Sequence, residues 1–214
     1  MTLDAISALA ALHHLDVFGT FHTNDDDGPG PGKTIVLLGP NEPGFWAHIH
    51  STKEWRDKSP DPIDRWSKRV VTEIAITLDA EPRFPFSKPA EPFLSWALRT
   101  GRAWSSPVHL LVHDTAGLWV SFRGALILDE LLDLPPPQTS PCSTCIDKPC
   151  LAACPTSALT SEGYDVPACH DFLNTSEGAD CMSSGCAVRR ACPISQGYKR
   201  EPAQSAYHME QFHK

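Results

Sequence analysis

All eight cysteines of this chain of 214 residues lie between Cys142 and Cys192. The first four follow the spacing C-x2-C-x4-C-x3-C, and the second four follow the looser spacing C-x11-C-x4-C-x5-C. In each group a proline follows the last cysteine, Pro155 in the first and Pro193 in the second. Thiolates gathered in this way bind soft metals, and the Cys-Pro step that ends both groups favours iron–sulfur clusters.

Two other uses of these cysteines stay open. Sets of four thiolates also hold structural zinc. Eight cysteines can also form four disulfides, which are typical of secreted proteins. The chain begins Met-Thr-Leu-Asp, with neither the charged n-region nor the apolar run of a secretory signal. We therefore expect a cytoplasmic protein, in which thiols stay reduced and clusters can be inserted.

The spacing resembles that of bacterial ferredoxins with two 4Fe–4S clusters, although their second gap has two residues where this chain has four. In those proteins the fourth cysteine of each run serves the other cluster, and the proline after it suits the first turn of a helix. The resemblance implies the following two ligand sets. The first cluster would bind Cys142, Cys145, Cys150 and Cys192, and the second Cys154, Cys169, Cys181 and Cys186.

The charge balance limits the partners. With 18 Lys and Arg against 26 Asp and Glu, the net charge is −8, so the chain as a whole is not expected to bind nucleic acid. An acidic surface suits an electron carrier that meets a redox partner protein of opposite charge. No apolar run approaches the ~18 residues that a membrane span requires, so we expect no membrane partner.

The residues before the cysteines alternate between helical and strand patterns. The expected helices cover 2–14, 45–50, 61–78 and 92–98, and the expected strands cover 16–23, 34–39, 108–113 and 118–128. The last two strands would form a hairpin around residues 114–117. This order predicts an α+β domain with a small antiparallel or mixed sheet. The stiff triplet Pro135–Pro137 predicts a boundary between this domain at 1–134 and a ferredoxin-like module at 135–214.

Three features together resemble the epoxyqueuosine reductases: residues 117–128, the two groups closed by Cys-Pro, and the stretch 154–159. In that family a cobalamin-binding, nitroreductase-like α+β domain precedes a ferredoxin module with two clusters. Residues 164–169 resemble the lone cysteine between the family's two runs, which implies that Cys169 serves the second cluster. No motif here matches the family's catalytic acid, and its C-terminal repeat domain has no counterpart, so we expect a short relative.

Three functions follow as hypotheses. The first is an electron-transfer protein with two 4Fe–4S clusters. The second is a small reductase that binds a corrinoid or flavin next to the clusters, in a pocket beside residues 105–128. Trp119, Phe122 and Arg123 could line that pocket, although Trp119 and Phe122 also fit the core of a strand. The third is a zinc-stabilised interaction protein. The sequence assigns no catalytic residue and leaves open whether the protein is an enzyme.

Two arginines near the last cysteine could adjust a cluster. Arg189 and Arg190 lie between Cys186 and Cys192. A cation beside a cluster favours the reduced, more negative form and so raises the reduction potential. Solvated surface arginines would be the alternative.

Overall fold

The structure, a computed structural model, describes all 214 residues and divides them into two compact units. The first unit comprises Met1–Arg102 and Ser121–Gln138, and the second comprises Ala103–Val120 and Thr139–Lys214. The boundary after Gln138 lies close to the one that the proline triplet predicts. Residues 103–120 belong to the second unit together with the cysteine region, whereas the sequence predicts that they belong to the first domain. The fold is α+β, as predicted.

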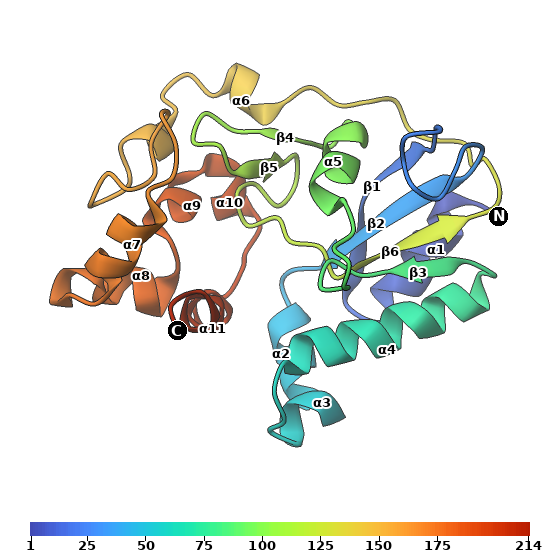
Figure 1. Cartoon of the computed structure of the whole chain (residues 1–214), viewed down its shortest axis with the longest axis horizontal. Coiled ribbons are helices and arrows are strands. Elements are labelled where there is room, and N and C mark those ends of the chain that lie inside the picture. The colour runs from blue at the N-terminus through green and yellow to red at the C-terminus, as the bar shows by residue number, and fades with distance from the viewer. The chain divides into compact units, whose positions relative to one another are not determined.

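The first unit is built on an antiparallel sheet of four strands in the order β1-β2-β6-β3 (Figure 1). Its strands are β1 (Leu15–His22), β2 (Thr34–Pro40), β3 (Glu81–Arg83) and β6 (Gly124–Leu128). Every residue of β2 and β6 is buried, so both faces of the sheet are covered. The continuous apolar run at residues 34–39 predicted such a strand.

Three helices pack on this sheet, α1 (Leu3–Ala11), α4 (Pro62–Thr77) and α5 (Phe93–Arg99) (Figure 1). Two short helices, α2 (Phe45–Ser51) and α3 (Lys53–Arg56), pack against each other, and α3 packs on α4. Thr2 caps α1, since its hydroxyl accepts a hydrogen bond from the backbone N of Ala5 at 3.3 Å. The apolar stripe of α4, which includes Trp66 and Val70, is buried, and the helix packs on β3 and β6. Asp61 precedes α4 as predicted but makes no side-chain capping bond.

The predicted hairpin of residues 108–113 with 118–128 does not form. Instead β5 (Leu111–His113) pairs with β4 (Ala103–Ser105), and β6 joins the sheet of the first unit. The turn after β5 closes tightly, because the backbones of His113 and Gly117 exchange two hydrogen bonds of 3.0 Å. Residues 118–123 then form no strand and lead from one unit into the other.

The second unit adds a series of short helices to the β4–β5 hairpin (Figure 1). They are α6 (Pro141–Thr144), η1 (Pro149–Leu151), α7 (Val166–Leu173), η2 (Ser176–Gly178), α8 (Ala179–Ser184), α9 (Ala187–Ala191), α10 (Pro193–Gly197) and α11 (Pro202–Phe212). Cys192 precedes α10 and Pro193 opens it, as predicted. A helix after Cys154 is absent, because a single turn ends at Ser157 with φ +53°. No helix in the chain has both the length and the apolar character that crossing a membrane requires.

Candidate metal centres

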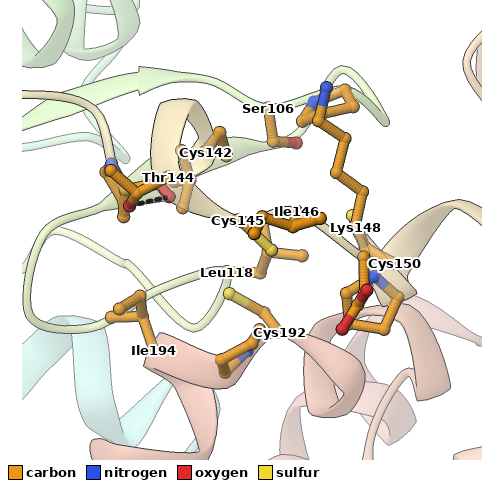
Figure 2. A pocket seen from close by; sticks show the side chains of 16 residues that line it. Ser106, Leu118, Cys142, Thr144, Cys145, Ile146, Lys148, Cys150, Cys192 and Ile194 are labelled. Atoms are coloured by element: carbon orange, nitrogen blue, oxygen red, sulfur yellow. Dashed lines mark hydrogen bonds between the residues drawn. The ribbon is translucent and has the colours of Figure 1, made fainter.

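The first predicted set of cysteines lines one cavity in the second unit. Cys142 comes from α6, Cys145 follows that helix, Cys150 lies in η1, and Cys192 precedes α10. The cavity has a volume of about 470 Å³, which falls within the range of cofactor sites. Figure 2 shows these four side chains around the same space. Cys192 therefore lies with Cys142, as the exchange of the fourth cysteine requires.

The walls of this cavity are mainly apolar. The β4–β5 hairpin and the segment after it contribute Pro107, Val112 and Leu118, and the cysteine region contributes Ile146 and Ile194. These walls are part of a buried core to which both segments of the unit contribute. It contains Val108, Val112, Leu118, Cys150, Leu159, Val188 and Cys192. This common core explains why residues 103–120 belong with the cysteine region.

Two thiols of the first set lie in surroundings that disfavour negative charge. Burial raises the pKa of Cys142, and the neighbouring thiols of Cys192 and Cys145 raise it further, whereas Ser140 and the charge of Lys148 lower it. Burial also raises the pKa of Cys150, and the same neighbouring thiols and Cys142 add to the effect. A bound cationic group would favour thiolates here, because it offsets their mutual repulsion.

The structure brings the second predicted set into electrostatic range as well. Cys169 lies in α7, Cys181 in α8, Cys186 directly before α9, and Cys154 in the turn that replaces the predicted helix. Burial raises the pKa of Cys169, and the charges of Cys186, Cys154 and Cys181 act in the same direction. Cys169 thus lies within electrostatic range of the other three cysteines of the second predicted set.

Tyr164 is a residue near this second set to which the sequence pattern assigned no role. Its hydroxyl hydrogen-bonds the thiol of Cys169, which lowers the pKa of that thiol and opposes the effect of burial. Burial and this hydrogen bond raise the pKa of Tyr164 itself, so the phenol stays protonated and can donate. Tyr164 begins the stretch 164–169, which resembles the family's segment with the lone cysteine. This position is the sequence signal that could have identified Tyr164 as a neighbour of Cys169.

The two arginines before Cys192 have different surroundings. Arg189 donates a hydrogen bond to the carbonyl of Leu118, and it lies within electrostatic range of Cys186. Burial lowers the pKa of its guanidinium, although arginine keeps its charge at neutral pH. Arg190 forms an ion pair with the exposed Asp180. The charge of Arg190 also lowers the pKa of Cys181, so both arginines lie within electrostatic range of the second set of cysteines.

The three residues predicted for a corrinoid or flavin pocket are divided between the two units. Trp119 lies in the second unit, whereas Phe122 and Arg123 lie in the first, because the chain passes between units after Val120. None of the three lines the cavity of the first cysteine set. A cavity beside residues 105–128 does exist, but Ser106, Val112 and Leu118 supply that part of its wall.

Each of these three side chains has local partners. Trp119 is buried, and the guanidinium of Arg200 lies over its ring at 5.1 Å from the centroid. The ring of Phe122 packs at 6.3 Å from that of Phe18, between centroids. Arg123 forms an ion pair of 3.5 Å with Asp64. Trp119 is thus a buried residue outside any strand, and Phe122 is only partly buried.

All eight cysteines are free thiols in the structure. No three His, Cys, Asp or Glu side chains are grouped tightly enough to hold a single metal ion. The first set nevertheless fits an iron–sulfur cluster by its donors, since four thiols from separate segments face one cofactor-sized cavity with apolar walls.

No family model matches the sequence, and no curated protein matches it. Among solved structures, the chain is similar to an epoxyqueuosine reductase, which was crystallised in selenomethionine-labelled form. The two structures superpose with a TM-score of 0.59 and 14% sequence identity, over 95% of this chain and 68% of the other. At this identity the likeness shows a common fold. The resemblance predicted from the cysteine region thus extends, as a fold, over almost the whole chain.

Proposed function

We propose that the protein is an iron–sulfur electron carrier with two 4Fe–4S clusters, one for each set of cysteines. The observation that carries the proposal is the cavity in which Cys192 joins Cys142, Cys145 and Cys150. These residues come from the two separate Cys-Pro groups, which supports the ligand set that the ferredoxin resemblance implies.

The roles of the residues follow from their surroundings. The four thiolates of each set would be the ligands, and their mutual repulsion favours a bound cation, which would lower their pKa values. Val112, Leu118 and Ile194 would keep water from the first cluster. Tyr164 and Arg189 would stabilise negative charge at the second. When bound, a 4Fe–4S cluster accepts and releases one electron at a time.

Metal and sulfide analysis tests this proposal. After anaerobic purification we expect about eight iron and about eight inorganic sulfide per chain. A variant with Ser at all eight cysteine positions, purified in parallel, should contain neither. Stoichiometric zinc without sulfide would contradict the proposal and favour a zinc-stabilised interaction protein.

The fold likeness to an epoxyqueuosine reductase supports a second candidate, a small reductase that binds a corrinoid or a flavin near the clusters. Equilibrium dialysis of the iron-loaded protein against cobalamin, FMN or FAD would distinguish the two functions. Stoichiometric binding of one of these cofactors would favour the reductase. Absence of binding, with both clusters present, would favour the carrier.

A further inference from the structure

Ser106 occupies an unusual position in the cavity of the first cysteine set. Its side chain is 6% exposed, and its hydroxyl oxygen is buried without a hydrogen-bond partner. Ser106 is among the residues that line the cavity, and Figure 2 shows it on the side away from Cys192. A buried hydroxyl in a native protein normally has a partner, so an unsatisfied one next to a cofactor-sized cavity calls for a ligand.

The backbone holds Ser106 in this place. Its N–H donates to the carbonyl of Leu110 at 2.9 Å, and its own carbonyl accepts from the N–H of His109 at 3.0 Å. These bonds close the loop between β4 and β5 around Ser106. The loop packs on the common core through Val108, which is fully buried. The loop therefore holds the backbone of Ser106 at the cavity wall, where its hydroxyl oxygen is buried.

The cavity offers this hydroxyl few acceptors of its own. Half of the lining residues are proline or aliphatic, and the others besides Ser106 are the four cysteines, Thr144, Asp147 and Lys148. None of these groups is a hydrogen-bond partner of the Ser106 hydroxyl. Thr144 also lines the cavity, but its hydroxyl already donates to the carbonyl of Pro141 at 3.3 Å (Figure 2). The group that would fill the cavity is therefore the most suitable acceptor.

We propose that the hydroxyl of Ser106 donates a hydrogen bond to a sulfur atom of the cluster bound by the first cysteine set, and so raises the reduction potential of that cluster. This inference rests on the proposed function. Reduction adds one negative charge to the cluster, and a donor stabilises the more negative form more strongly. Hydrogen bonds to cluster sulfurs are a known determinant of such potentials.

A redox titration followed by electron paramagnetic resonance tests the proposal on the iron-loaded protein. In Ser106→Ala we expect the ratio of reduced to oxidised first cluster, at a fixed potential, to fall about tenfold, which corresponds to about 59 mV for a one-electron couple. The second cluster should titrate as in the wild type. Ser106→Thr keeps a hydroxyl and should restore the potential. Thr144→Val, the control in the same cavity, should leave it unchanged.

The outcomes separate this inference from the proposed function. A wild-type chain without iron and sulfide overturns the proposed function and this inference with it. Two loaded clusters whose potentials do not move in Ser106→Ala overturn this inference alone. If Ser106→Ala fails to retain the first cluster, Ser106→Val and Ser106→Thr provide a matched pair. Retention of the first cluster in Ser106→Thr with its loss in Ser106→Val supports a role for the hydroxyl. Loss of the first cluster in both variants shows that Ser106 serves packing only.

Discussion

The two sets of cysteines depend on different parts of the chain. The first set lines a cavity whose wall includes Val112 and Leu118, which precede the cysteine region and come from the segment 103–120. Three cysteines of the second set lie in or directly before α7, α8 and α9. Of these helices, α8 packs against α7 and α11, whereas α9 packs against η1 and α10. The segment 103–120 contacts the second set through α9, by way of Val188 and Arg189.

This difference has a consequence for stability. Contacts between distant segments must overcome a larger loss of chain entropy than contacts between neighbours. The first set needs Cys192 to return to Cys142 and also needs the β4–β5 hairpin in place. We therefore expect changes in the hairpin or at Cys192 to affect the first cluster before the second.

The largest expected effect tests the exchange of the fourth cysteine. Cys192→Ala removes a thiol from the first set only, so the iron content should fall from about eight to about four per chain. The paramagnetic signal of the second cluster should persist. Cys186→Ala is the matched control and should remove the second cluster instead. Loss of the second cluster from Cys192→Ala would show that each Cys-Pro group closes on itself.

A smaller effect is expected at Gly117, where the segment 103–120 meets α10. Its φ is +57°, and a Cβ atom there would lie 2.4 Å from the backbone N of Ser195. Gly117→Ala should therefore lower the free energy of unfolding by about 2–4 kcal/mol, from backbone strain and the clash together. Urea unfolding measures this value.

Gly197→Ala is the control in the same unit, because no atom lies within 4 Å of a Cβ at that position. Its unfolding free energy should stay within about 0.5 kcal/mol of the wild type. In partly unfolded Gly117→Ala samples, the first cluster should be lost before the second. Simultaneous loss of both clusters would mean that the two sets depend equally on the segment 103–120.

The smallest effect concerns the second set. Tyr164→Phe removes the hydroxyl that donates to Cys169, so the second cluster should become harder to reduce. At a fixed potential we expect the ratio of reduced to oxidised second cluster to fall about threefold to tenfold, the value of one hydrogen bond. The first cluster is the internal control in the same titration. A change in the reduction potential of the first cluster alone would show that Tyr164 does not act on the second set.

Local sequence patterns determined much of this structure. The periodic apolar residues of α1 and α4, the Thr2 cap and the continuous run of β2 each act within a few residues, so they can be recognised without the fold. The cysteine spacing likewise carries the resemblance to two-cluster ferredoxins, which implies the two ligand sets.

Only the tertiary structure decided how the segment 103–128 is used. Its apolar residues predicted strands, but alternation says nothing of which partner a strand will choose. The partners follow from which apolar surfaces become buried. The end of the segment pairs with β2 as strand β6 of the first unit. Val108, Val112 and Leu118 pack with cysteines of the second unit. This division separated Trp119 from Phe122 and Arg123 and placed Ser106 in the cavity, since contacts between distant residues depend on how whole elements pack.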